Sequence, residues 1–184
     1  MPASQPAQAV QSQPSELRTK IARFAPTDVA ADVSKLSAPD RRVLAKLIEA
    51  SKVLDGIYLR QIWVGNEAML IDLARDESPA GRDRLHFFLI NKGPWSRIDH
   101  NQVFIAGAPG KPDAANFYPE GASKAELERW IQSLPEPERA QATGFFSVIR
   151  RRPNGGFTAV PYNVEYQSDL TSAAHWSCQV AEES

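Results

Sequence analysis

The sequence has few of the residues that build disulfides, metal centres or membrane spans. Cys178 is the only cysteine, which excludes an internal disulfide and a cysteine metal cluster. The three histidines, His86, His100 and His175, never recur at the i, i+4 spacing that puts two imidazoles on one metal. No apolar run approaches the roughly 20 residues that a membrane span requires. We therefore find no complete metal-binding or membrane-spanning pattern.

An excess of positive or negative charge is also missing. With 21 basic and 22 acidic residues the formal net charge is -1, which gives no electrostatic footprint for nucleic acid. Arg150, Arg151 and Arg152 form a short basic run, but strand alternation would send them to opposite faces, which favours a solvated hairpin end over an anion site. Cys178 has no neighbouring base to activate it as a nucleophile. The ordinary composition and the length of 184 residues predict one globular domain.

The N-terminal residues lack the apolar surface that folding needs. Pro2 to Ser15 is a Gln/Ala/Pro/Ser stretch, so residues 1–16 are predicted to form a disordered tail. It has no basic n-region and no long apolar h-region, which predicts a cytoplasmic protein as the sequence stands. The same composition is typical of linkers that follow a signal peptide, so a periplasmic location applies if a signal has been lost upstream.

The strongest local pattern predicts a helix from about Pro39 to Val64. Ser37 is a good N-cap and Asp40, three residues on, completes a capping-box pattern. Apolar and small residues then recur at helical spacing: Leu44, Leu47, Ser51, Leu54, Tyr58 and Ile62. Val43, Ile48 and Ile57 widen this stripe, so we expect the helix to be covered on more than one side.

The remaining elements predict an α+β fold that is predominantly α-helical. Capping and periodicity indicate further helices at Glu67–Arg75, at Pro79–Asn91, after Ser123 with Glu126 as its capping-box partner, and at Glu136–Thr143. Strand-like runs at Gly144–Arg151 and Phe157–Tyr162 flank Asn154-Gly155, a strong hairpin signal. A lone hairpin is marginal in water, so it must pack on the helices or join strands from elsewhere.

A long loop from Pro94 to Gly121 separates the two groups of helices. Its prolines, glycines and interspersed aromatics indicate an ordered, irregular segment, and such loops often carry function. Trp95, Asp99 and Asn101 could line a peptide-binding cleft, with the indole supplying area and the polar groups orientation. The alternative is a self-satisfied loop in which Asp99 and Asn101 cap its own turns.

Three segments resemble one known family. Asn91-Lys92-Gly93-Pro94-Trp95-Ser96-Arg97-Ile98-Asp99, Ala115-Asn116-Phe117-Tyr118-Pro119 and Gly144-Phe145-Phe146-Ser147-Val148-Ile149-Arg150-Arg151 are similar to bacterial relatives of dipeptidyl peptidase III and to the peptidase-like half of a plant Nudix hydrolase. The resemblance runs from about Ile21 to Ala174. It adds Asn116 and Tyr118 to the substrate-binding candidates.

The resemblance implies a two-lobed zinc metallopeptidase that removes dipeptides from peptide N-termini. Zinc in that family sits on a mainly helical lobe, held by a histidine–glutamate helix motif whose glutamate is the general base. This chain contains no His-Glu dipeptide. The resemblance therefore implies a part that precedes the zinc lobe, binds no metal itself, is inactive alone and forms one wall of the peptide cleft.

On this interpretation residues 17–174 are the N-terminal region of such a protein. Residues 175–184 form a divergent tail that departs from the family's helical continuation, as a frameshift or premature stop would produce. A fragment cut in this way is expected to self-associate through uncovered apolar faces. The alternatives are a free-standing helical binding module that uses the Trp95 to Tyr118 loop and, with least support, an intact enzyme of another type.

Overall fold

A computed structural model describes residues 15–183 and confirms a predominantly helical α+β fold. The helices are α1 Glu16–Ile21, α2 Ala38–Ile62, α3 Asn66–Ala74, α4 Pro79–Asn91, α5 Lys124–Ser133, α6 Glu136–Ala142, α7 Tyr162–Glu165 and α8 Gln167–Glu183. Two hairpins pair β1 Trp95–Ser96 with β2 Gln102–Val103 and β3 Ser147–Arg151 with β4 Phe157–Pro161; the 3-10 turns are η1 Arg97–Asp99 and η2 Ala115–Phe117. The predicted tail lies outside the described residues up to position 14, and Glu16 already belongs to α1.

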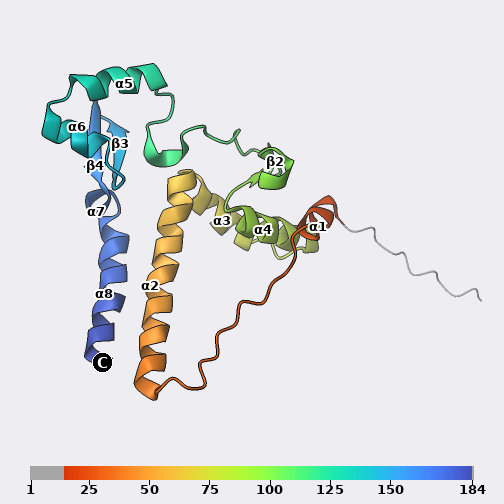
Figure 1. Ribbon diagram of the computed structural model, residues 1–184. Helices are drawn as coiled ribbons and strands as arrows, with labels where there is room; N and C mark the ends of the chain where they lie inside the picture. Colours follow the sequence, from red (N-terminus) through yellow and green to blue (C-terminus); the bar gives the residue numbers. More distant parts are fainter. Residues whose placement is uncertain (1–14, 184) are drawn as a thin grey trace, which may run out of the picture.

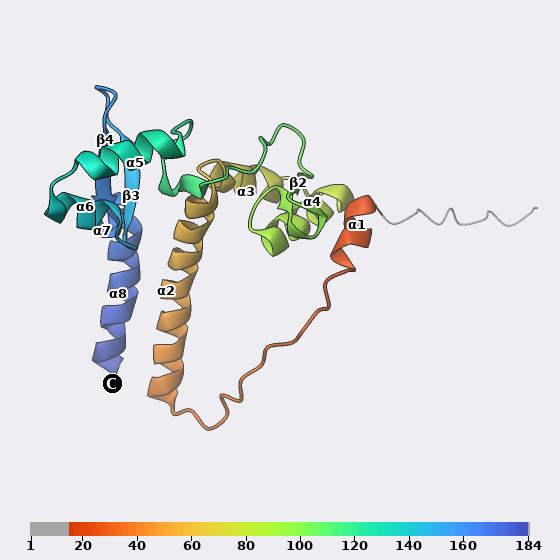
Figure 2. The same cartoon turned by 45° about the horizontal axis from the view of Figure 1, so that its top comes forward.

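The long helices α2 and α8 lie side by side, and the smaller elements gather near one end of the pair (Figures 1 and 2). The predicted capping box starts α2: Asp40 N–H donates to Ser37 Oγ at 3.2 Å, and Asp40 Oδ2 accepts from Ser37 N–H at 3.2 Å. The expectation that α2 is covered on more than one side holds at its C-terminal end, where Ile57 and Leu59 pack into two different clusters. Along the rest of α2, α8 is the one described helix that runs beside it.

Residues 175–183 are helical, which corrects for them the prediction of a departure from a helical continuation; position 184 lies outside the described residues. They extend α8 to Glu183. Packing on α2 explains the difference: the Lys46 ammonium lies 4.8 Å from the centre of the Trp176 ring, and Arg60 Nη2 lies 2.5 Å from Asp169 Oδ2. These two contacts make the helices antiparallel.

The β3–β4 hairpin joins two apolar clusters. Strand alternation sends Val148 and Ile149 to opposite faces, and each is almost fully buried. Val148 packs with Ile57 of α2 and Tyr166, whereas Ile149 packs with residues of α5 and α6. A third cluster holds α3 and α4 against the end of α2 through Leu59, Leu73, Phe88 and Ile105. The prediction that the hairpin must pack on helices is thereby confirmed.

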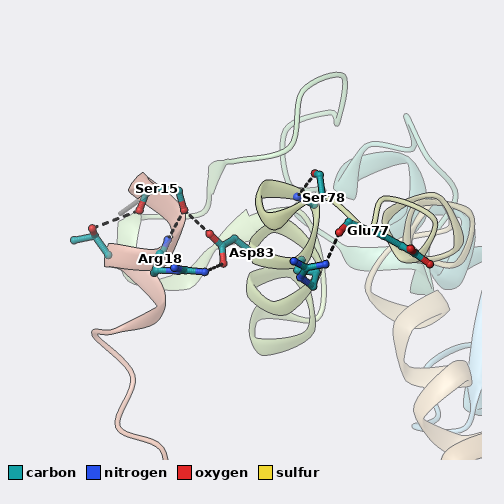
Figure 3. A network of polar contacts seen from close by, with 8 residues as sticks. Ser15, Arg18, Glu77, Ser78 and Asp83 are labelled. Atoms are coloured by element: carbon teal, nitrogen blue, oxygen red, sulfur yellow. Dashed lines mark hydrogen bonds and ion pairs between the residues drawn. The ribbon is translucent and has the colours of Figure 1, made fainter. Parts of the chain in front are cut away.

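Helix α1 docks on α4 through polar contacts. The Ser15 hydroxyl donates to Asp83 Oδ2 at 2.6 Å while it accepts the Arg18 N–H that begins α1, and the Arg18 guanidinium reaches the same carboxylate (Figure 3). Asp99 provides a second attachment. Its carboxylate accepts from Ser96 Oγ at 2.7 Å and from Arg23 Nη1 at 2.9 Å, and Lys20 Nζ lies 3.3 Å away.

Two helical glycines should respond in opposite directions to alanine. A Cβ at Gly81 would lie 2.2 Å from the backbone oxygen of Asp76, so Gly81→Ala should destabilise the protein by about 1–3 kcal/mol. A Cβ at Gly56 would meet nothing within 4 Å, so Gly56→Ala should stabilise it by up to about 1 kcal/mol through helix propensity. Urea unfolding of both variants tests this; two changes of equal sign would contradict the packing around α4.

The Asp99 contacts predict a pH dependence. Hydrogen bonds from Ser96 and Arg23, with Lys20 nearby, lower the pKa of Asp99 to about 2. A pKa depressed in the folded state gives stability that is present above the ordinary pKa near 3.8 and lost as the pH falls toward 2. Asp99→Asn should therefore lower the urea midpoint at pH 7, and progressively less as the pH falls from 3.8 toward 2. Asp28→Asn, at an exposed position, is the control, and a deficit independent of pH would refute the ion cluster.

Candidate functional site

The loop from Pro94 to Gly121 carries the predicted site residues, and its geometry separates them. Trp95 is only 3% exposed, and its indole N–H donates to the Pro109 oxygen at 2.8 Å. The ring packs edge-on against Trp63, with 5.6 Å between centroids. Trp95 thus fixes the fold of the loop and presents only part of its surface to a hollow of about 200 Å³. That hollow is lined by Tyr58, Ile62, Asn91, Trp95, Arg97, Lys111 and Ala115.

Asn116 and Tyr118 line a second hollow of about 290 Å³ on the neighbouring part of the loop. The Asn116 amide donates to the Arg60 oxygen at the end of α2 at 2.9 Å, and its backbone oxygen accepts from Arg150 at 2.9 Å. Asn116 therefore acts chiefly as a link between α2 and the β3–β4 hairpin. Tyr118 is 38% exposed, and its ring is available at the rim of the hollow.

Asn101 lies at the tip of the β1–β2 hairpin and faces a third hollow, which it shares with His100 and Lys111. Its backbone is left-handed, with φ 61°, and its side-chain oxygen accepts from Lys111 Nζ at 3.2 Å. Asp99 lines none of these three hollows, because its carboxylate is used by Ser96, Lys20 and Arg23. Asp99 therefore stabilises its own segment, as expected for a self-satisfied loop. The other four candidates, Trp95, Asn101, Asn116 and Tyr118, border open space.

Arg150 is half-buried and does not belong to a solvated hairpin end, so that prediction is wrong for this residue. Glu165 Oε1 accepts from its Nε at 2.9 Å and from its Nη2 at 2.5 Å. Arg151 points to the opposite side of the strand, where it binds Glu126 at 3.3 Å. The predicted capping box at Ser123 is therefore half formed: Ser123 accepts from the Glu126 N–H, but the Glu126 side chain is turned to Arg151.

Two buried amides that the sequence reasoning missed position the start of the loop. Asn66 donates to the oxygens of Leu59 at 3.0 Å and Lys92 at 3.2 Å. Asn91 donates to the Phe87 oxygen at 2.8 Å and accepts from the Arg97 N–H at 3.0 Å. Their partners are backbone groups brought together by the turn after α4, so no spacing in the sequence signals them. These two amides fix the path of the chain from the end of α4 to Trp95 and Arg97.

The described residues offer little for chemistry. Across positions 15–183, no three His, Cys, Asp or Glu side chains lie close enough together to hold a metal ion. Cys178 is an exposed thiol on α8, and His175 lies one turn before it, 2.9 Å from Gln179. In the same part of the chain, every helix is too short or too polar to cross a bilayer. What the loop presents is a set of hollows with aromatic, amide and cationic linings.

Comparisons with known proteins agree with this geometry. No family model matches the chain. The chain is 34% identical over 173 residues to Nudix hydrolase 3 of Arabidopsis thaliana, an alignment that covers 78% of this chain and 22% of the plant protein. The solved structure of dipeptidyl-peptidase III from Corallococcus sp. strain EGB superposes on 91% of the chain with a TM-score of 0.87 and 51% identity. That of DPP III from Caldithrix abyssi does so with a TM-score of 0.84 and 36% identity.

In both solved structures the match covers 31% of the other chain, so this chain spans less than a third of the length of those proteins. The resemblance predicted from the three loop and strand segments is confirmed by independent agreement in sequence and in fold. The chain is thus similar in sequence and in fold to dipeptidyl-peptidase III, over a match that covers 31% of each solved chain.

Proposed function

We propose that the chain is the N-terminal part of a dipeptidyl-peptidase-III-like peptidase and forms one wall of its peptide-binding cleft. The observation that carries the proposal is the 51% identity and TM-score of 0.87 to a dipeptidyl-peptidase III over 91% of the chain. The zinc implied by that family needs clustered imidazole and carboxylate ligands. The described residues supply no such group, so we assign the metal and the general base to the part of the protein that this chain does not span.

The wall is the Trp95 to Tyr118 loop. Its backbone is held from inside by the Trp95 indole, the Asn91 amide and the Asn116 amide, so little conformational entropy would be lost on binding. Tyr118 offers an aromatic face to a peptide, and Asn101 with Lys111 offers an amide and an ammonium donor. These groups can orient a chain that lies across them, but they cannot move a proton or activate water.

The second candidate function is a free-standing binding module that uses the same loop. It is favoured by one observation, that the loop is held by hydrogen bonds within this chain, from the Trp95 indole to the Pro109 oxygen and from the Asn116 amide to the Arg60 oxygen. Self-association through exposed apolar faces would accompany the fragment proposal and not the module. The two functions therefore differ in whether the loop works only with a further polypeptide.

The chain by itself should bind no zinc in stoichiometric amounts and release no dipeptides. The reason is the lack of a three-ligand group and of a positioned base among the described residues. Metal analysis after extensive dialysis, and peptidase assays with and without added zinc, test both statements. About one zinc per chain, or turnover that copurifies with the chain through several columns, would contradict them.

A chimera tests the proposed function. Residues 15–183 would replace the matched third of the Corallococcus dipeptidyl-peptidase III, and we expect the chimera to release dipeptides. Tyr118→Ala in the chimera should raise KM by about tenfold with a smaller change in kcat, since it removes a binding contact. Phe145→Ala, which truncates an exposed aromatic outside the loop, is the control. A folded chimera without activity, or equal effects of the two variants, would overturn the proposal.

A further inference from the structure

One flank of α2, beside the face that contacts α8, is apolar and exposed. Five large side chains on it are between 36% and 49% exposed: Leu44, Leu47, Ile48, Leu54 and Tyr58. They recur at spacings of three, four and seven residues, so they form one continuous stripe along the helix. We call this stripe the outer face of α2.

The side of α2 that faces α8 is occupied. Ala50 and Ile57 are buried there, Lys46 lies over Trp176, and Arg60 binds Asp169 of α8. Both views show α8 alongside α2 and the other helices only near one end of it (Figures 1 and 2). Pairing with α8 therefore leaves the outer face of α2 without a partner among the described residues.

The outer face has the dimensions of a helix-binding surface. Leu44 and Tyr58 are 14 residues apart, or about 21 Å at 1.5 Å per residue, which matches a partner helix of about four turns. The seven-residue repeats that relate Leu44 to Tyr58 and Leu47 to Leu54 are those of helices packed side by side. A helix at a free surface normally turns polar residues to water, so an apolar stripe of this length marks an interaction site.

We propose that the outer face of α2 docks an amphipathic helix from the two thirds of a dipeptidyl-peptidase-III-like polypeptide that this chain does not span. The length of the solved relatives supports this occupant. The match covers 31% of each of them, so the unmatched part is more than twice as long as the matched part. The inference rests on the proposed function for the identity of the partner. It goes further in naming the surface and the kind of element that covers it.

The test compares the same substitutions in two settings. Leu47→Glu with Leu54→Glu should hardly change the melting temperature of the full 184-residue chain, because both side chains already face water. In the chimera with the Corallococcus protein, the double variant should lower the melting temperature by at least about 3 °C, since two carboxylates would be buried unpaired. Ile71→Glu on α3, which is 49% exposed, is the matched control and should be neutral in both.

A second measurement uses the partner in trans. The tagged chain, co-expressed with the unmatched two thirds of the Corallococcus protein, should capture that polypeptide, and the double variant should capture at least tenfold less. A chimera that tolerates the double variant as well as Ile71→Glu would overturn the docking site. Dimers of the chain that the double variant dissociates, with no effect in the chimera, would assign the face to a second copy. Melting and capture do not depend on activity, so an inactive chimera that still shows the stability difference would refute the proposed function alone.

Discussion

The architecture depends on one half-buried ion pair and the hydrogen bonds that extend from it. Arg150 on β3 binds Glu165 of α7 and the backbone oxygen of Asn116, and Asn116 in turn caps the end of α2 through the Arg60 oxygen. The Arg60 side chain continues the chain of contacts to Asp169 of α8. Helix α2, the η2 turn at Asn116 and the C-terminal elements β3, α7 and α8 are thereby tied together. Removal of one partner would leave charged or polar groups desolvated without compensation, which costs more than an exposed ion pair contributes.

This network also connects the fold to the candidate site. Asn116 was predicted as a substrate contact, but its amide is used to hold the loop against α2. Trp95 likewise directs its only polar atom into the loop. The side chains left for a ligand are those at the rims, chiefly Tyr118, Asn101 and Lys111. If the loop is the wall proposed above, it would bind by shape and by these few oriented donors.

Local signals predicted most of the helices because the residues that cap their ends lie next to them in the sequence. The Ser37–Asp40 box, Ser78 before Pro79 and the Asn154-Gly155 turn each fix an element without help from distant residues. The extension of α8 through residue 183 was not predicted, since it depends on packing against α2. Lys92, where a glycine would be expected, takes a left-handed conformation with its carbonyl bound by Asn66. The burial of Trp95 and the partners of Arg150 are tertiary, so no periodicity could reveal them.

The central claim is that the Trp95 to Tyr118 loop contacts peptide as one wall of a cleft completed by the rest of a dipeptidyl-peptidase-III-like protein. The most direct measurement is photo-crosslinking of a slowly cleaved peptide, carrying a photoreactive side chain, to the chimera with the Corallococcus protein. The account predicts crosslinks to residues 101–118, and their loss when unlabelled peptide competes. Crosslinks confined to the part of the chimera outside residues 15–183 would contradict it.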